Sequence, residues 1–164
     1  MISKTMQNAL NEQINKELYS SYLYLAMSAS CAESNYPGFA AWLRVQSGEE
    51  TTHAMKMYAY IHDHGNHVEL AAIEKPPVKF KSPKDIFAQV LEHEKKVTAM
   101  ITKLYDLALK EDDYPTQIFL QWFITEQVEE ERNASEIIER MKLIGDVGPA
   151  LMMLDRELGS RGKD

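Results

Sequence analysis

Prolines divide this 164-residue sequence into a few long uninterrupted stretches, and this division most constrains how the chain can fold. The six prolines lie at positions 37, 76, 77, 83, 115 and 149, and each long interval between them is free of strong helix breakers. Within these intervals apolar residues recur at spacings of three and four, which is the period of a helix with one buried face. The pattern therefore predicts an all-α fold.

We expect four long helices, over about residues 5–33, 39–64, 83–110 and 114–145, and a short fifth helix over about residues 149–158. Ser82 and Pro83 indicate where the third helix begins, because serine is a favoured N-cap and proline suits the first helical position. Long helices of about 27 residues are near 40 Å long. The middle connection can span that length, which predicts a four-helix bundle with one long crossover between helices two and three.

Length and composition limit the kind of protein. The chain is about one domain long, so we expect residues 1–164 to form a single domain. A net charge of −7 argues against nucleic acid or an anionic membrane as a partner. The single cysteine, Cys31, excludes an intramolecular disulfide framework and fits a reducing compartment. With no signal-peptide core and no long apolar run, we expect a cytoplasmic protein.

Each of the four long helices carries one glutamate near the midpoint of its apolar seam. These glutamates are Glu17, Glu50, Glu94 and Glu130. His53 follows the second glutamate by three residues, and Gln127 precedes the fourth by three. Because helix midpoints lie at one level in a bundle, these side chains should converge in the core.

Four carboxylates buried together need compensating positive charge. The seams near them hold no lysine or arginine, so two divalent cations are the remaining answer, and one histidine among oxygen ligands suits iron. Any one of these glutamates could instead lie at the seam edge and face water. Four coincident midpoints with a Glu-x-x-His pair favour the metal interpretation, because they reproduce the di-iron carboxylate arrangement of helical bundles.

The chain resembles the prokaryotic non-haem ferritins, and the similarity extends over essentially its whole length. The segments that carry the resemblance are NEQINKELYSSYLYL, SGEETTHAMK, LEHE and LQWFITEQVEEE. The resemblance implies a first iron held by Glu17, Glu50 and His53, with Glu50 bridging to a second iron. Glu94 and Glu130 would hold that second iron, with Gln127 beside it. A third iron site would use Glu49, Glu126 and Glu129 together with Glu130, although these three could form a solvated acidic face. Tyr24 would lie beside the centre as an electron donor or as a packing residue.

The resemblance also implies the activity and the assembly. Fe(II) would be oxidised by O2 or H2O2 and stored as a ferric mineral inside a 24-subunit homo-oligomer. A second apolar stripe on the first helix predicts a two-fold subunit contact; its residues are Leu18, Tyr22, Leu25 and Ala29. The fifth helix would line four-fold contacts through Leu151, Met152 and Leu154, or would pack against its own bundle.

Differences between this chain and related families narrow the family that the chain resembles. Bacterioferritins have a second Glu-x-x-His where this chain has Gln127-x-x-Glu130, and they bind haem through a methionine where this chain has Thr52, so no haem is expected. The mini-ferritins lack a fifth helix, and rubrerythrins need cysteine pairs. Two other classes stay open: a metal-free structural or signalling bundle, and an oxidase acting on an organic substrate.

Overall fold

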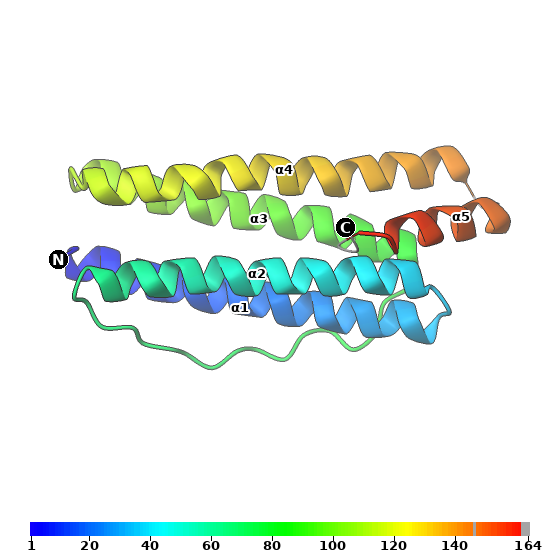
Figure 1. Ribbon diagram of the computed structural model, residues 1–164, viewed down its shortest axis with the longest axis horizontal. Coiled ribbons are helices and arrows are strands. Elements are labelled where there is room, and N and C mark those ends of the chain that lie inside the picture. The colour runs from blue at the N-terminus through cyan, green and yellow to red at the C-terminus, as the bar shows by residue number, and fades with distance from the viewer. Residues whose placement is uncertain (146, 162–164) are drawn as a thin grey trace.

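The computed structural model describes residues 1–145 and 147–161, and within these residues it contains five helices and no strand. The helices are α1 (Lys4–Glu33), α2 (Pro37–Asp63), α3 (Pro83–Lys110), α4 (Tyr114–Ile144) and α5 (Gly148–Leu158). The first four lie side by side in an elongated bundle, and α5 folds back at one end (Figure 1). The expected all-α fold with a short fifth helix is confirmed, and the expected ends differ from the observed ones by a residue or two.

Local capping fixes where the helices begin. Ser3 accepts a hydrogen bond from the Met6 amide at 2.9 Å, and Ser82 accepts one from the Asp85 amide at 3.2 Å. Asp113 caps α4 in the same way. Because side-chain caps fix the starts of α1, α3 and α4, the levels of Glu17, Glu94 and Glu130 along the bundle are fixed as well.

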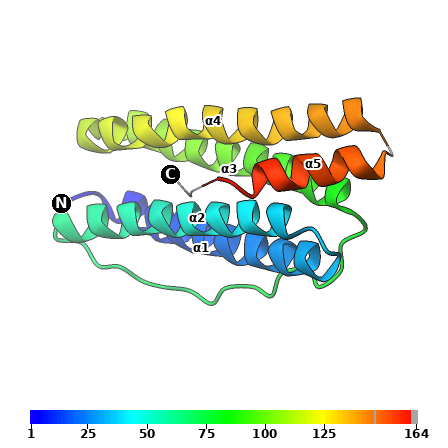
Figure 2. The ribbon, with the colours of Figure 1, turned by 45° about the vertical axis from the view of Figure 1, so that its right-hand side comes forward.

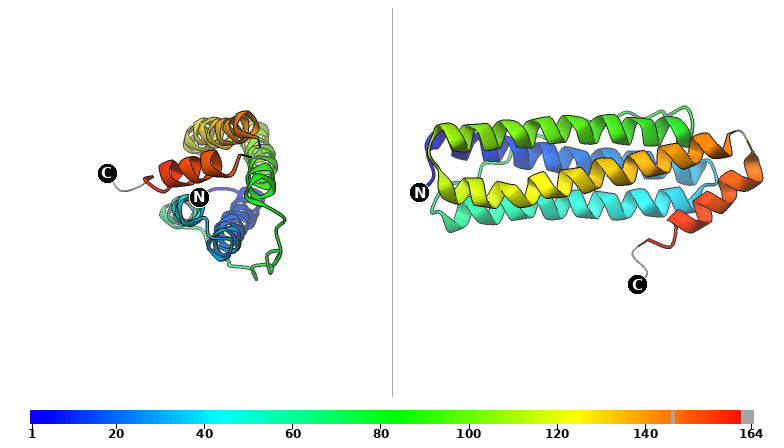
Figure 3. Two further views of the ribbon diagram at one scale, coloured as in Figure 1. Left: turned by 90° about the vertical axis from the view of Figure 1, so that its right-hand side faces the viewer. Right: turned by 90° about the horizontal axis from the view of Figure 1, so that it is seen from above.

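The long connection between α2 and α3 runs along the outside of the bundle from one end to the other, so α2 and α3 run parallel (Figures 1 and 3). Side chains of α1 hold this segment in place. Asn11 donates to the His67 carbonyl at 3.2 Å and accepts from the Glu69 amide at 3.0 Å, and Asn15 donates to the Ala71 and Ala72 carbonyls. These amides satisfy backbone groups that have no helix or strand partner.

The core consists of two apolar clusters with a polar layer between them. One cluster surrounds Tyr24, Phe39 and Phe87, and the other surrounds Leu10 and Ile101. The four midpoint glutamates are buried as the sequence predicts, and so are His53 and Gln127. Apolar packing on both sides therefore holds the polar layer away from water.

Helix α5 docks on the first turn of α2 (Figure 2). The Asp155 carboxylate accepts hydrogen bonds from the Gly38 amide at 3.1 Å and the Phe39 amide at 2.7 Å. A Cβ at Gly38 would lie 1.7 Å from the Asp155 carbonyl oxygen, so this approach requires glycine. Leu154 is buried within its own chain rather than presented for four-fold contacts, whereas Met152 is 68% exposed.

None of the helices in the described ranges combines the length and apolar character needed to cross a membrane.

Candidate metal centre

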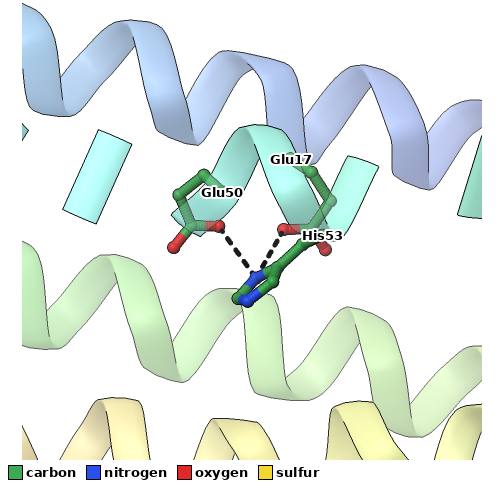
Figure 4. A group of neighbouring side chains, drawn as sticks. All are labelled: Glu17, Glu50 and His53. Carbon is green, nitrogen blue, oxygen red and sulfur yellow. Dashed lines mark ion pairs between the residues drawn. The ribbon is translucent and has the colours of Figure 1, made fainter. Parts of the chain in front are cut away.

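Glu17, Glu50 and His53 form one half of a buried centre (Figure 4). Glu17 comes from α1, whereas Glu50 and His53 lie one turn apart on α2. Nδ1 of His53 is 3.5 Å from Oε2 of Glu50 and 3.9 Å from Oε2 of Glu17. Among the described residues, that Glu17 oxygen has no hydrogen-bond partner. An unpaired buried carboxylate oxygen facing an imidazole nitrogen is an arrangement that suits a cation.

Aromatic rings fix the orientation of the His53 imidazole. Trp122 and Phe123 of α4 contact it edge-on, with ring centroids 5.4 Å and 6.1 Å away. Because these contacts restrict rotation of the ring, Nδ1 stays turned toward Glu17 and Glu50.

Glu94 of α3 and Glu130 of α4 form the other half, and hydrogen bonds already hold both. Tyr24 donates a hydrogen bond to Oε1 of Glu94, and Gln127 donates to Oε2 at 3.2 Å. Gln46 donates to Oε2 of Glu130 at 2.6 Å. The midpoint side chains thus meet at one level, as the sequence predicts, with Gln127 as a donor to Glu94.

Burial dominates the electrostatics of this layer. Desolvation, followed by repulsion from a neighbouring carboxylate, raises the pKa of Glu17 and of Glu50 well above the usual range. Desolvation and the Glu94 charge raise the pKa of Glu130 to about 7. Within the described part of the chain, no lysine or arginine forms an ion pair with the four midpoint glutamates. They must hold protons or bind cations.

The three additional acidic residues expected beside the centre lie in different surroundings. Oε1 of Glu126 is 3.9 Å from Nε2 of His53, and these two with Glu130 could hold one metal ion. Glu49 instead pairs with Arg161 at 2.6 Å. Glu129 is exposed and joins neither potential metal group found in the described residues. The structure therefore brings Glu126 to the centre and leaves the other two at its margin.

Two buried glutamines are part of the site, although they were not predicted from the sequence. Gln13 donates to Oε1 of Glu17 at 2.9 Å, and Gln46 contacts both Glu50 and Glu130. The sequence spacing could have identified them, because each glutamine precedes its glutamate by four residues and so lies on the same helix face. Arg161 carries no such signal, since it is 115 positions from Gln46.

Comparisons with known proteins agree with this geometry. Residues 7–144 match the ferritin-like domain family, and every candidate ligand lies within that range. A bacterial non-heme ferritin of Campylobacter jejuni is 42% identical over 156 residues, which cover 95% of this chain and 93% of that protein. A bacterial non-heme ferritin of Staphylococcus aureus (strain USA300) is 40% identical over 164 residues, which cover 100% of this chain and 99% of the other. The solved structure of an open pore ferritin from the hyperthermophilic archaeon Archaeoglobus fulgidus superposes with a TM-score of 0.97 at 46% identity, covering 98% and 99% of the two chains.

Proposed function

The chain belongs to the ferritin family of iron-storage proteins, and we propose that its buried centre oxidises Fe(II) with O2 or H2O2 before the iron is stored as a ferric mineral. One observation carries this proposal. Four glutamates and a histidine from different helices meet in an apolar core, where no lysine or arginine of the described chain pairs with the carboxylates. Positive charge brought by the substrate is the compensation that such a layer needs.

The two halves of the centre would take one Fe(II) each. Glu17 and His53 would bind the first, Glu94 and Glu130 the second, and Glu50 would bridge them. Hard, anionic oxygen ligands stabilise Fe(III) relative to Fe(II) and so favour loss of an electron from each iron. Two Fe(II) reduce O2 with two protons to H2O2, or reduce H2O2 with two protons to two waters.

The carboxylates would also couple iron binding to proton release. Since burial and mutual repulsion raise the pKa of Glu17, Glu50 and Glu130, these groups keep their protons to a higher pH than ordinary carboxyl groups do when metal is absent. Ligation requires the deprotonated form, so each binding step releases protons. Attraction to iron then offsets the desolvation and the mutual repulsion of the deprotonated carboxylates.

Glu126 supports a further step, in which iron leaves the centre. It lies at the edge of the site, and its side chain is 29% exposed while that of His53 is nearly covered. We assign Glu126, together with Glu49, Glu129 and Glu130, to a third, more exposed iron position. Tyr24 would act as an electron donor, because its hydroxyl is bonded to Glu94, which could accept the phenol proton as the electron leaves.

Storage requires a hollow assembly, and the surface of α1 supports one. Tyr22 and Leu25 are each close to half exposed, and they line an apolar groove together with Val78 of the crossover. A lone bundle gains nothing from such a stripe, whereas a two-fold contact would bury it. We propose self-association through this face into a closed homo-oligomer of 24 subunits.

Stepwise aerobic addition of Fe(II) to the purified protein tests the function. Gel filtration then separates protein-bound iron from free ferric precipitate, and iron per subunit is counted in the protein peak. We expect a large assembly that retains far more iron than the two or three ions its own ligands can bind. Precipitation at the rate seen in protein-free buffer would contradict the proposal.

A further inference from the structure

Arg161, just beyond α5, reaches across to α2 and contacts three of its residues. Nη1 donates to Oε1 of Gln46 at 2.9 Å, and Nη2 donates to Oε2 of Glu49 at 2.6 Å. The guanidinium also lies over the ring of Trp42, with its carbon 4.6 Å from the ring centroid. Three contacts of different kinds thus hold one side chain at the edge of the metal centre.

Gln46 is the link between this arginine and the buried carboxylates. Its amide nitrogen donates to Oε2 of Glu130 at 2.6 Å and lies 3.4 Å from Oε1 of Glu50. An amide turned the other way would direct its carbonyl oxygen at two carboxylates and its NH2 group at a guanidinium. Arg161 therefore favours the one orientation in which the NH2 group faces the centre.

We propose that Arg161 is a positioning residue of the iron centre, which acts by fixing the Gln46 amide toward Glu130 and Glu50. This inference rests on the proposed function of the centre. Gln46 in turn fixes the carboxylate planes through which the bridging Glu50 and the second-iron ligand Glu130 meet the metal. The C-terminal segment is thereby connected to the second metal position, although it contributes no ligand.

The geometry requires arginine rather than any cation. Two separate nitrogens contact two different residues while the planar group lies on Trp42. A lysine could neutralise Glu49, but its single nitrogen lacks the fixed fork that also holds Gln46. Charge and positioning can therefore be separated by substitution.

Anaerobic Co(II) titration, followed by the visible absorption of the bound ion, tests the inference with a probe that needs no turnover. Wild type should bind two Co(II) per subunit at the centre. Arg161→Ala and Arg161→Lys should both weaken the second binding event by roughly tenfold and change its spectrum, as loss of a residue that orients ligands does. Arg140→Ala is the matched control, because it removes another arginine pair that holds α5, and among the described residues the Arg140 guanidinium donates to Glu157 and not to Gln46.

A double-mutant cycle identifies the route of the effect. In a Gln46→Leu background, Arg161→Ala should cause no further loss of Co(II) affinity. In a Glu49→Gln background, it should still cause most of the tenfold loss. Unchanged affinity in Arg161→Ala, an equal loss in Arg140→Ala, restoration by lysine, or an undiminished effect without Gln46 would each overturn the inference. Absence of Co(II) binding in wild type would instead overturn the proposed centre itself, and with it this inference.

Discussion

The Tyr24 hydroxyl donates a hydrogen bond to Oε1 of Glu94, and this contact joins α1 to α3 at the level of the metal centre. Gln127 occupies the other oxygen of the same carboxylate. Glu17 differs, because its Oε2 is without a hydrogen-bond partner among the described residues. The half of the centre built on Glu17 is thus open to a cation, whereas iron at the Glu94 half must compete with existing hydrogen bonds.

Tyr24→Phe should lower the free energy of unfolding of the metal-free protein by about 1–3 kcal/mol, because a buried carboxylate loses its donor. The same change should slow the reaction steps that follow the first oxidation if Tyr24 supplies an electron. Chemical denaturation and stopped-flow absorbance measure the two effects. Tyr58→Phe, at an exposed tyrosine of α2, is the control and should change neither.

Glu129→Ala and Glu50→Ala should separate the early and late stages of iron uptake. Glu50→Ala removes the bridge between both irons, so rapid oxidation of two Fe(II) per subunit should slow by more than roughly 100-fold. Glu129→Ala should preserve that first phase, because Glu129 is exposed, and should alter the iron-to-oxygen ratio at higher loading. If Glu129→Ala removed the first phase as well, the division between inner and outer ligands would be wrong.

Stability of the metal-free protein should fall as pH rises from about 4.5 through 7. Glu130 has a folded-state pKa of about 7 and a reference value of 4.5, so in this window the folded state keeps a proton that the unfolded chain has lost. The stabilisation is complete below pH 4.5 and is lost by neutral pH, a change of about 3 kcal/mol for this group. Glu17 and Glu50 act in the same direction.

Denaturation of wild type and of Glu130→Gln across this pH range measures that contribution. The variant cannot titrate at position 130, so its stability should decline less, by about 3 kcal/mol. Identical pH profiles of stability for the two proteins would contradict the raised pKa of Glu130.

Two glycines of α2 should respond to alanine in opposite ways. Gly38→Ala should destabilise the protein by about 1–3 kcal/mol, because the new Cβ would overlap the Asp155 backbone and force α5 to move. Gly48→Ala has no atom within 4 Å of its new Cβ and should stabilise the helix by about 1 kcal/mol. Thermal unfolding of the two variants checks the sign of each change.

The helices and the core seams could be predicted because their signals are local. Ser82 and Pro83 define a helix start from adjacent residues, and the period of apolar positions identifies the face that becomes buried. Glu17 and Glu94 stand out in the sequence because a carboxylate in an apolar seam needs an explanation. Helix midpoints lie at one level in a bundle, so the convergence of the four glutamates could be predicted without knowing any side-chain rotamer.

The margin of the centre could not be predicted in the same way. The sequence predicts one acidic group made of Glu49, Glu126 and Glu129. In the structure, Glu49 pairs with Arg161, Glu126 lies near His53, and Glu129 is exposed. Those differences depend on helix rotation and on where α5 docks. The docking depends in turn on the close approach of Asp155 to Gly38, which no local pattern encodes.

The most direct test of the central claim is a crystal loaded with Fe(II) without oxygen and measured at the iron absorption edge. We expect two anomalous peaks per subunit on either side of the Glu50 carboxylate, one beside Glu17 and His53 and the other beside Glu94 and Glu130. Glu50→Ala crystals treated identically should lose at least one of the two peaks. Iron only at the outer acidic residues, with no peak between the four midpoint glutamates, would contradict the account.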